Sequence, residues 1–354
     1  MKILIPVLQF GKAGGYRVLS NLANEWINMG HQVHFISTIS SNKPYFPTIA
    51  NVYWVDNKGD FKTEEDLVSE DSYRFWNRWS ALCKGMNRLE SDYDIVLANQ
   101  NLTAYALIFS KISGKKFYYI QAYEPEYGWL SGSFAHKLLS LIAWHSYNLK
   151  IEKIVNADVY KHYKNIKTDK VVLPGLDLKI FYPENIELIV NPIKLGCIGR
   201  LEVYKGTQYV MDAFLVLRQV IPDIELHIAF GDKSLELIEG VTIVSPTNDF
   251  ELANYYRSMD ILIAPGTVQM GAVHYPVIEA MACGTAVITT GYYPAKDSNA
   301  WLVPVKNANA IAEQVQSIIK NPSLVDKKIT NGLKDVTEFE WSLVASKMLN
   351  YFSK

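Results

Sequence analysis

Short apolar runs alternate with helical patterns along the first half of the chain. The opening run KILIPV is followed by a glycine-containing turn and then by apolar residues at helical spacing, which are Val18, Leu19, Leu22, Trp26 and Ile27. Gly30 is expected to end this helix, and QVHFIS to form the next strand. The later runs NVYWV, DIVLAN and KFYYIQA are almost wholly apolar, as is typical of strands buried on both faces of a parallel sheet. This half therefore predicts a doubly wound α/β domain.

A second series with the same rhythm begins near residue 193. It consists of IKLGCIGR, then a helix with Val210, Ala213, Phe214 and Leu217, then ELHIAF, VTIVS, DILIAP and TAVITT. The segment VVLPGLDLKIFYPE between the two series has no clear period, which predicts a linker at about 174–190. The last stretch, EFEWSLVASKMLNYF, is predicted to be a helix with the apolar face Trp341, Val344, Met348, Tyr351 and Phe352. Two such domains leave a cleft at the carboxyl ends of their strands, where ligands bind.

Length and composition agree with two domains and exclude some functions. The 354 residues fit two domains of about 150 to 200 residues. The 35 basic and 36 acidic side chains are balanced, so the bulk charge does not favour nucleic acid. Cys83, Cys197 and Cys283 are widely spaced, which indicates neither a disulfide framework nor a zinc site. The first apolar run is too short for a signal peptide and no run approaches the roughly 20 residues of a membrane span, so a cytoplasmic location is the default expectation.

The turn GKAGGYR at residues 11–17 is the first candidate for ligand binding. Glycines let backbone amides approach an anion, and the start of a helix favours negative charge. Gly14 and Gly15 therefore fit either a tight structural turn or a contact to phosphate or substrate. A nicotinamide dinucleotide site is disfavoured, because the pattern differs from G-x-G-x-x-G and the second strand ends in Ser37 and Thr38 without an acid.

The matching turn of the second series is GRLEVYKG at residues 199–206. Arg200 and Lys205 lie near a helix start, where the helix dipole disfavours cations. A diphosphate is a multiply charged anion, which a guanidinium and an ammonium can neutralise without a metal. The pair is predicted to bind such a group, and two solvated surface cations are the alternative.

The third candidate is the stretch GAVHYPVIEAMACG at residues 271–284. Pro276 suits the first helical position and Gly284 the end of the helix, so Glu279 is expected in the first turn near free amides. Glu279 either stabilises the helix dipole or accepts hydrogen bonds from paired hydroxyls such as a ribose diol. For His274, a packed or exposed histidine is favoured over a catalytic one.

Together these stretches resemble the retaining nucleotide-sugar enzymes of glycosyltransferase family 4, which have the GT-B fold. The resemblance covers nearly the whole chain and is carried, in order, by PGLDLKIFYP, GRLEVYKG and the segment from ANYYRSMDILIAPG to YPVIEAMACGTAVITT. It implies two Rossmann-like domains facing across a cleft. The first comprises residues 1–174 with the C-terminal helix at about 338–354, and the second comprises residues 190–337.

The same resemblance implies residue roles. Arg200 and Lys205 would bind the donor diphosphate, and Glu279 the donor ribose. The donor-binding set as a whole is Gly14, Gly15, Thr247, Gly271, Ala272, Val273, His274, Tyr275 and Glu279. The loop 271–275 would meet the sugar with backbone amides.

Two positions depart from the family pattern. The first acid of the usual E-x7-E pair falls on Gly271, and the usual His-Asp pair falls on Gln121 and Ala122. The segment with Tyr123 and Glu124 instead resembles the Q-D-x-E-P pattern of a rhamnosyltransferase-like branch, with Ala122 in place of its acid. Gln121, Tyr123 and Glu124 are therefore the candidates on the acceptor side.

The implied reaction retains the anomeric configuration and lets the leaving diphosphate take the acceptor proton. It requires neither a cofactor nor a metal. A UDP- or dTDP-sugar is the favoured donor, and a glycan or lipid-linked glycan of the cell envelope is the expected acceptor. A nucleotide-sugar epimerase and a non-catalytic nucleotide-sugar or carbohydrate-binding protein are the alternatives.

Residues 134–155 allow two interpretations. They combine large apolar residues with Lys137, Lys150 and Lys153, and further lysines follow at 161, 164, 167 and 170. One interpretation is a buried helix followed by a solvated face. The other is a face that rests on the inner leaflet of the plasma membrane, where each basic residue near an anionic surface could add about 1 kcal/mol.

Overall fold

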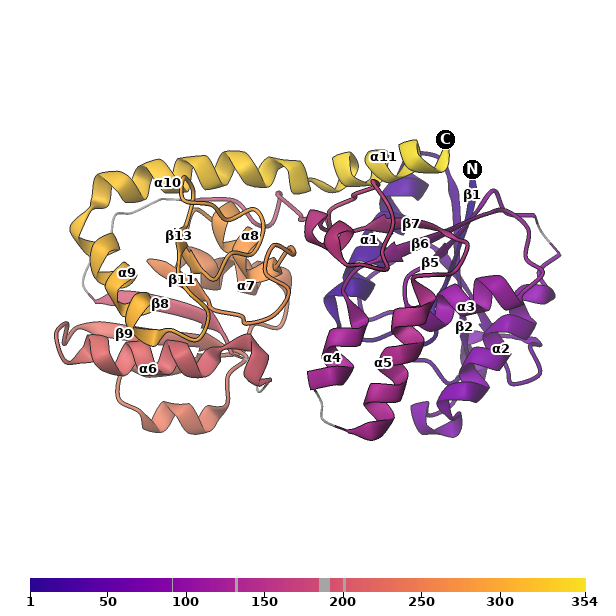
Figure 1. Cartoon of the computed structure of the whole chain (residues 1–354), viewed down its shortest axis with the longest axis horizontal. Coiled ribbons are helices and arrows are strands. Elements are labelled where there is room, and N and C mark those ends of the chain that lie inside the picture. Colours follow the sequence, from indigo (N-terminus) through magenta and orange to yellow (C-terminus); the bar gives the residue numbers. More distant parts are fainter. Residues whose placement is uncertain (91, 131–132, 185–191, 200–201) are drawn as a thin grey trace. The chain divides into compact units, whose positions relative to one another are not determined.

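The structure is a computed structural model that describes residues 1–90, 92–130, 133–184, 192–199 and 202–354 (Figure 1). The chain divides into two compact units, unit 1 with Met1–Gly175 and Trp341–Lys354, and unit 2 with Leu176–Glu340. Residues 176–184, which the sequence assigned to a linker, belong to unit 2. Arg257 holds them by donating hydrogen bonds to the carbonyl oxygens of Ile180 (3.2 Å) and Tyr182 (3.1 Å).

Unit 1 is built on a sheet with the strand order β4-β3-β2-β1-β5-β6-β7. Its strands are β1 (Lys2–Pro6), β2 (Gln32–Thr38), β3 (Asn51–Val55), β4 (Phe61–Lys62), β5 (Ile95–Ala98), β6 (Lys115–Ile120) and β7 (Glu152–Val155). Neighbouring strands are parallel except β3 and β4. The chain builds outward from β1 on one side and then returns to place β5 on the other, so the topological switch point lies between β1 and β5.

The helices of unit 1 pack partly on the sheet and partly on one another. They are α1 (Gly14–Asn28), α2 (Phe75–Asn87), α3 (Asn101–Phe109), α4 (Glu124–Leu130), α5 (Phe134–Ser146) and α11 (Trp341–Phe352). Short 3₁₀ helices of this unit span Glu64–Asp66, Glu70–Ser72 and Asp158–His162. The five strands and the first helix predicted for this half are confirmed, and α1 ends just before Gly30, as expected.

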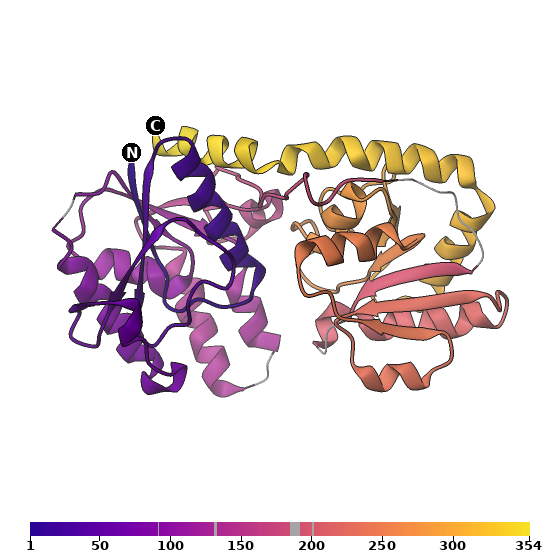
Figure 2. The ribbon, with the colours of Figure 1, turned by 180° about the vertical axis from the view of Figure 1, so that it is seen from behind.

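The C-terminal helix α11 packs against α1 (Figure 2). The Trp26 indole N–H donates to the carbonyl oxygen of Ala345 (3.2 Å), and the Trp26 ring lies 5.6 Å from that of Phe352. Phe352 also contacts Phe117 of β6, with ring centroids 4.9 Å apart. The apolar face that the sequence predicted for this helix therefore covers an apolar stripe of unit 1.

Residues 134–155 do not form one buried helix. The helix α5 ends at Ser146, and Glu152–Val155 is the edge strand β7, which pairs with β6. The side chains of Phe134 and Leu138 are exposed, so the interpretation of this stretch as a buried helix is wrong. Lys153 is part of β7, and its ammonium donates to the carbonyl oxygens of Leu149 and Ile151 at 2.9 Å each.

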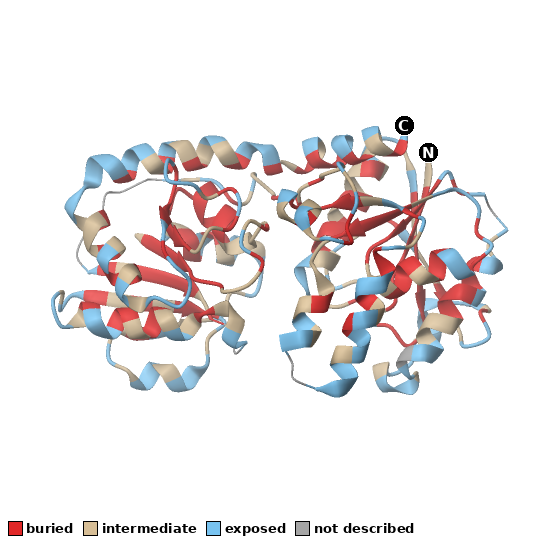
Figure 3. Ribbon diagram, in the orientation of Figure 1, coloured by how far each residue is buried: buried red, intermediate tan, exposed pale blue. Residues whose placement is uncertain are grey.

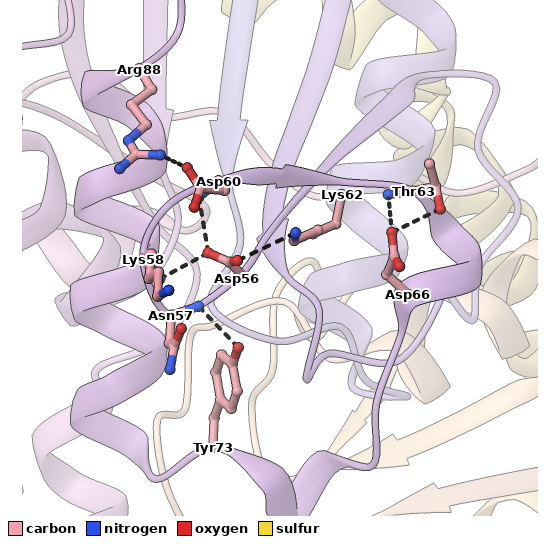
Figure 4. Close-up of polar contacts among 9 residues, drawn as sticks. All are labelled: Asp56, Asn57, Lys58, Asp60, Lys62, Thr63, Asp66, Tyr73 and Arg88. Atoms are coloured by element: carbon pink, nitrogen blue, oxygen red, sulfur yellow. Dashed lines mark hydrogen bonds and ion pairs between the residues drawn. The ribbon is translucent and has the colours of Figure 1, made fainter.

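The turn between β3 and β4 is closed by Asp56 (Figure 4). The Asp56 carboxylate accepts hydrogen bonds from the backbone N–H groups of Lys58 (2.8 Å) and Asp60 (3.0 Å), which is the geometry of an Asx turn. Lys62 Nζ lies 3.6 Å from the same carboxylate, and Arg88, the residue after α2, pairs with Asp60. The charged residues of this edge are thus explained by local structure.

Unit 2 is built on a parallel sheet with the order β10-β9-β8-β11-β12-β13. Its strands are β8 (Ile193–Ile198), β9 (Ile224–Ala229), β10 (Val241–Val244), β11 (Ile261–Ala264), β12 (Ala286–Thr289) and β13 (Trp301–Leu302). Its helices are α6 (Thr207–Arg218), α7 (Asp249–Arg257), α8 (Tyr275–Ala282), α9 (Ala308–Lys320) and α10 (Pro322–Asp335), with 3₁₀ helices at Val203–Lys205, Lys233–Leu237 and Val336–Phe339. The switch point here lies between β8 and β11.

The core of unit 2 lies between the sheet and its helices. Val210, Ala213, Phe214 and Leu217, which the sequence placed on one helical face, are all buried on α6. The central strands of both sheets, β1 and β5 in unit 1 and β11 and β12 in unit 2, are buried along most of their length (Figure 3). All three cysteines are buried free thiols whose pKa burial raises, to about 11 for Cys83 and about 12 for Cys197 and Cys283.

Candidate active site

Each unit has predicted ligand-binding residues at its own switch point. In unit 1 the loops after β1 and β5 lead to Gly14 and to residues 99–101. In unit 2 the loops after β8 and β11 contain the turn 199–206 and the segment 265–275. Open α/β sheets bind ligands at this point, outside the carboxyl ends of their strands. The topology therefore brings the candidate residues of each unit to one edge of its sheet.

Lys205 lies where the sequence predicted it, just before a helix. It ends the 3₁₀ helix Val203–Lys205, and α6 begins at Thr207. Its ammonium nitrogen lies 5.5 Å from the centroid of the Tyr204 ring, a distance at which a cation is attracted to an aromatic face. Arg200, the other predicted cation, lies outside the described residues.

The turn that carries Lys205 is bound to the loop after β11. The backbone N–H and the hydroxyl of Thr267 both donate to the carbonyl oxygen of Tyr204, at 2.9 and 3.2 Å. Gly206 has a φ of 79°, and a β-carbon there would lie 2.3 Å from the carbonyl oxygen of Pro265, so only glycine fits. These contacts hold Lys205 beside the segment that leads into α8.

The start of the loop 271–275 is held by the segment after β12. The N–H of Gly271 donates to the carbonyl oxygen of Gly291 (2.8 Å), and the N–H of Ala272 to that of Gln269 (3.0 Å). Both amides are thus used inside unit 2. The expectation that the whole loop offers backbone amides to a sugar is therefore wrong at Gly271 and Ala272, and it stays a prediction for the rest of the loop.

The second part of this loop positions the start of α8. Val273 forms a bridge with Tyr293, and His274 is the residue that precedes the first turn of the helix, which begins at Tyr275. The His274 ring stacks on Tyr292, with centroids 4.6 Å apart and planes inclined by 30°. The structure thus places His274 as a packed histidine, which was the first interpretation of the sequence.

Glu279 lies deeper in α8 than expected. Because the helix begins at Tyr275 with Pro276 second, Glu279 lies beyond the first turn, which contains no acid. The residue is 2% exposed, and its Oε2 accepts a hydrogen bond of 2.8 Å from the hydroxyl of Tyr256 on α7. The dipole effect falls off within the first turn, so stabilisation of the helix start does not explain this acid.

Tyr256 is the residue that orients Glu279. Burial, and then the charge of Glu279, raise the pKa of Tyr256 well above its ordinary value, so the phenol keeps its proton and donates. The hydroxyl of Thr285 in turn donates to the backbone carbonyl oxygen of Tyr256 (2.7 Å). The carboxylate of Glu279 is therefore held in one orientation inside the unit.

Thr247 follows β10 and directly precedes Asn248, the residue that caps the start of α7. Its N–H and hydroxyl donate to Glu251 Oε2, at 2.7 and 2.9 Å, and Asn248 Oδ1 accepts from the N–H of Glu251 (2.9 Å). This is a reciprocal cap of the helix start, and the bonds from Thr247 lower the pKa of Glu251. The structural role of Thr247 is thus established, while its role in donor binding stays a prediction.

The predicted residues of unit 1 also converge. A β-carbon at Gly15, in the first turn of α1, would lie 3.4 Å from both terminal atoms of the Gln121 side chain, which follows β6. Gly14, the first residue of the same helix, is exposed. Among the described residues, the buried Oε1 atom of Gln121 has no hydrogen-bond partner. The turn 11–17 and the acceptor-side candidates therefore meet at one edge of the sheet.

Glu124 begins α4, and its carboxylate is enclosed by protein. Its Oε1 accepts hydrogen bonds from the backbone N–H of Asn101 (3.1 Å) and from the hydroxyl of Tyr118 (3.1 Å), while Asn101 Nδ2 donates to Oε2. Burial raises the pKa of Glu124 to about 7, although the hydrogen bonds from Tyr118 and Asn101 oppose the shift. This carboxyl can therefore hold or release a proton near neutral pH.

Tyr123 packs on two other tyrosines. Its ring lies 5.7 Å from that of Tyr147, nearly parallel to it, and 4.1 Å from that of Tyr163. The hydroxyl of Tyr147 contacts the backbone of Glu124 and Ala122. Tyr123, Tyr147 and Tyr163 thus form an aromatic cluster beside Glu124.

Comparison with known proteins identifies the activity class. Residues 192–321 match the family described as "Glycosyl transferases group 1". An uncharacterized glycosyltransferase of Haemophilus influenzae is 24% identical over 91% of this chain and 92% of its own length. The chain is a glycosyltransferase. The phosphatidyl-myo-inositol mannosyltransferase of Mycobacterium leprae is 27% identical over 43% of each chain.

Solved structures confirm the fold class of this glycosyltransferase as GT-B. Sucrose-phosphate synthase from Thermosynechococcus elongatus has a TM-score of 0.76 at 17% identity and covers 100% of this chain and 98% of its own. HepE of Anabaena, solved with UDP and glucose, has a TM-score of 0.73 at 16% identity and covers 100% of both chains.

The sequence did not predict three residues of the candidate site in this glycosyltransferase. Asn101, Tyr118 and Tyr256 each bind one of the two acids. A signal was present for Asn101, because the amide run Asn99-Gln100-Asn101 directly follows the apolar strand β5. No local signal marked Tyr118, which lies inside the predicted strand KFYYIQA, or Tyr256, which lies in α7.

No cluster of three or more potential metal ligands occurs in the described part of the glycosyltransferase. The sequence contains the pattern Asp92-Tyr93-Asp94, but it precedes β5 and so lies at the amino end of its sheet, away from the switch point of unit 1. Asp94 accepts a hydrogen bond from the N–H of Lys2 (2.7 Å), and Asp92 one from the Ser113 hydroxyl (2.9 Å). Both acids have structural roles.

Proposed function

We propose that the chain transfers a hexose, with retention of configuration, from a UDP- or dTDP-linked sugar to a glycan or lipid-linked glycan in cell-envelope polysaccharide synthesis. We place it in glycosyltransferase family 4, near its rhamnosyltransferase-like branch, and at the cytoplasmic side of the membrane. The observation that carries the proposal is the connected edge of unit 2, where the turn with Lys205 is hydrogen-bonded to the loop that leads into the helix of Glu279.

The proposed roles in unit 2 follow from charge. Lys205, with Arg200 from the same turn, binds the diphosphate. The helix dipole disfavours cations at the start of a helix, and a bound anion would offset this repulsion. Glu279 accepts hydrogen bonds from the ribose diol and is oriented by Tyr256. The donor is bound as a substrate, without cofactor or metal.

In the proposed reaction the bond between the anomeric carbon and the diphosphate oxygen breaks, and its electron pair goes to the diphosphate. The acceptor oxygen bonds to the anomeric carbon on the same face, and its proton passes to the leaving diphosphate. Lys205 and Arg200 stabilise the negative charge that develops on the leaving group. The amides of Val273, His274 and Tyr275 are the predicted contacts of the sugar.

The proposed acceptor side is the edge of unit 1. Gln121 and Glu124 bind acceptor hydroxyls, and Tyr123 packs against a sugar ring. Gly14 and Gly15 belong to the predicted donor-binding set and leave room for a phosphate or a substrate at the start of α1. Two relatives support the substrate classes. HepE was solved with UDP-glucose, and TarM with α-GlcNAc-glycerol and UDP.

A nucleotide screen tests the donor first. Thermal unfolding is followed with UDP, dTDP, GDP and their sugars, and a ligand at 100 times its Kd should stabilise the protein by about 2.7 kcal/mol. We expect UDP or dTDP to stabilise the wild type and not the Lys205→Ala variant. Stabilisation by none of the nucleotides would overturn the donor assignment.

Product analysis then separates the reaction classes. Nucleoside diphosphate release is measured with and without a panel of glycan and glycolipid acceptors, and the anomeric configuration of the product is read by NMR. Acceptor-dependent release with a retained configuration supports the proposal. Inversion of the donor sugar at C2 would identify an epimerase, and nucleotide binding without turnover on any acceptor would identify a binding protein.

A further inference from the structure

The hairpin of α4 and α5 presents apolar side chains to solvent. Phe134, Leu138 and Leu141 are 84%, 53% and 52% exposed, and they lie four and three residues apart on one face of α5. The opposite face of α5 carries the buried Ser140 and Ala143. A surface helix normally turns its apolar face inward, so α5 is the reverse of the usual pattern.

The apolar surface continues over α4 and the end of α5. Trp129 and Leu130 of α4 and Trp144 of α5 are 52%, 53% and 44% exposed. We call the six residues Trp129, Leu130, Phe134, Leu138, Leu141 and Trp144 the hairpin face. Figure 3 shows the exposed parts of α4 and α5 in pale blue.

The hairpin is a packed element, so its exposed side chains do not arise from a loose segment. A β-carbon at Gly128 of α4 would lie 2.0 Å from Ser140 Oγ and 2.7 Å from the carbonyl oxygen of His136 on α5. The Ser140 hydroxyl donates to that same carbonyl oxygen (3.0 Å). Only glycine permits this approach, and the two helices therefore present the hairpin face as one surface.

The segment that contains the hairpin face carries charge of one sign. Residues 127–151 contain no Asp or Glu, but they contain Lys137 and Lys150. Neither lysine forms an ion pair within the described part of the chain. Lys164 and Lys167 are also exposed, and their loop is bound to α5 because Asn165 Nδ2 donates to the carbonyl oxygen of Trp144 (2.6 Å).

The lysines farther along belong to other contacts. Lys161 pairs with Asp158 (2.5 Å) and Lys170 with Glu152 (3.1 Å), and Lys153 binds backbone carbonyls. Of the basic run noted in the sequence, Lys164 and Lys167 are thus the two that remain for a partner. No helix in the described part of the chain combines the length and apolar character needed to cross a membrane.

We propose that the hairpin face docks on the surface of an anionic lipid bilayer, with the aromatic and leucine side chains in the interface and Lys137, Lys150, Lys164 and Lys167 against the headgroups. Trp and Tyr prefer the boundary between water and lipid, and lysines near it are attracted by anionic lipid. A face that is apolar at its centre and basic at its edge matches this partner.

The hairpin lies beside the acceptor-side candidates of unit 1. Glu124 begins α4, and Tyr123 packs on Tyr163, next to the loop of Lys164. Docking would therefore hold the acceptor-side candidates of unit 1 near the membrane surface. The inference does not depend on the proposed donor, because binding to vesicles is measured without nucleotide.

The test is co-sedimentation of the full chain with vesicles. Equimolar phosphatidylglycerol and phosphatidylcholine provide the anionic surface, and pure phosphatidylcholine the neutral one. We expect binding to the anionic vesicles that weakens with salt, and a loss of about 100-fold or more in the variant with Phe134, Leu138 and Leu141 replaced by Ser. Replacing Lys137 and Lys150 by Gln should weaken anionic binding by about 10-fold or more.

Matched controls lie on unit 2. Leu237 is 90% exposed, so Leu237→Ser removes an equally exposed apolar side chain and should leave vesicle binding unchanged. Lys320→Gln together with Lys327→Gln removes two exposed charges and should have little effect. Equal losses in these controls would overturn the assignment of the surface.

A second measurement does not depend on the Ser variant. The fluorescence emission of Trp129 and Trp144, identified with Trp129→Phe and Trp144→Phe, should shift to the blue on anionic vesicles. Negligible binding to both vesicle types overturns the proposal. A dimer in light scattering that the triple Ser variant dissociates would assign the face to a second copy, and a large loss of melting temperature in that variant would assign it to a contact within the chain.

Discussion

Glu124 in unit 1 and Glu279 in unit 2 are two acids at the carboxyl edges of two similar sheets, yet their environments differ. Glu124 receives hydrogen bonds from a backbone N–H, an amide side chain and Tyr118, and burial still raises its pKa to about 7. Glu279 is 2% exposed and is held by a phenol whose own pKa is raised. The same fold thus provides one carboxyl suited to proton exchange and one suited to fixed hydrogen bonding.

The difference arises from what each helix faces. Glu124 stands at the first residue of α4, where the first residue of α3 offers its N–H. Glu279 lies inside α8, facing α7. Variants at each edge can therefore separate two proposed roles, binding of the donor in unit 2 and binding of the acceptor in unit 1.

The largest expected effect is the loss of the cation in unit 2. Lys205→Ala should lower kcat/KM by roughly 10²-fold or more, because it removes a charge that stabilises the leaving diphosphate. Arg200→Ala should have an effect of the same size. Initial rates of acceptor-dependent nucleotide release measure both. Lys233→Ala, an exposed lysine of the same unit, is the control, and wild-type rates in the Lys205 variant would refute the role.

The next effect concerns Glu279. Glu279→Gln should weaken binding of free UDP by about 10-fold and that of the UDP-sugar equally, because the lost charged hydrogen bonds go to the ribose. Isothermal titration calorimetry measures both affinities. An unchanged affinity for the free nucleotide is incompatible with a ribose contact.

Tyr256→Phe serves as the companion variant, because it keeps the carboxylate of Glu279 and removes its orienting bond. We expect a smaller loss, about 5-fold, in the affinity for free UDP and for the sugar nucleotide alike. A change confined to stability, with unaltered affinities, would show that Tyr256 is structural only.

Glu124 should make stability depend on pH. Its folded pKa of about 7 exceeds its ordinary value of 4.5, so the folded state holds the proton longer. The stability of the folded state therefore falls as pH rises from about 4.5 to about 7 and is constant above that window. The neutral Glu124→Gln should lack this loss, and its advantage over wild type should grow by an amount on the order of 1 kcal/mol between about pH 5 and about pH 8.

Chemical denaturation at both pH values measures this difference. Glu251→Gln, at an exposed capping acid of unit 2 whose pKa is lowered from 4.5, is the control. Its difference from wild type should hardly change between these two pH values, because a lowered pKa alters stability only below about pH 4.5. A constant difference between Glu124→Gln and wild type at all pH values would contradict a raised pKa.

The smallest expected effect is on stability at Gly15. Ala in the first turn of α1 meets Gln121 at an ordinary contact distance, so Gly15→Ala should keep or raise stability by about 0.5 to 1 kcal/mol. If Gly15 admits substrate, kcat/KM for the acceptor should nevertheless fall by about 10-fold. Unchanged kinetics would leave the tight structural turn as its role.

Much of the fold followed from apolar periodicity. The alternation of runs such as KILIPV and DILIAP with helical patterns predicted two parallel α/β domains, because strands buried on both faces show continuous apolar residues. Glycine and cation positions in the turn 199–206 predicted where Lys205 would stand. These features are local, because a short turn between a strand and a helix can adopt few backbone conformations.

The candidate site was predicted only in part. The sequence placed Glu279 in the first helical turn, but α8 begins at Tyr275, so the carboxylate faces Tyr256 instead of free amides. Glu124 has two partners that the sequence did not reveal. Asn101 is 23 residues away along the chain, and Tyr118 lies inside the strand β6. No periodicity could reveal a carboxyl whose pKa depends on burial.

By itself the sequence determined the order of the central strands, the apolar faces of the helices α1, α6 and α11, and the turns that carry the cation and the glycines. Only the tertiary structure decided what covers each face. The apolar face of α11 is covered by Trp26 and Phe117, whereas the apolar side of α5, equally regular in sequence, is left to solvent. Periodicity is a property of one segment, but burial depends on which other segment packs against it.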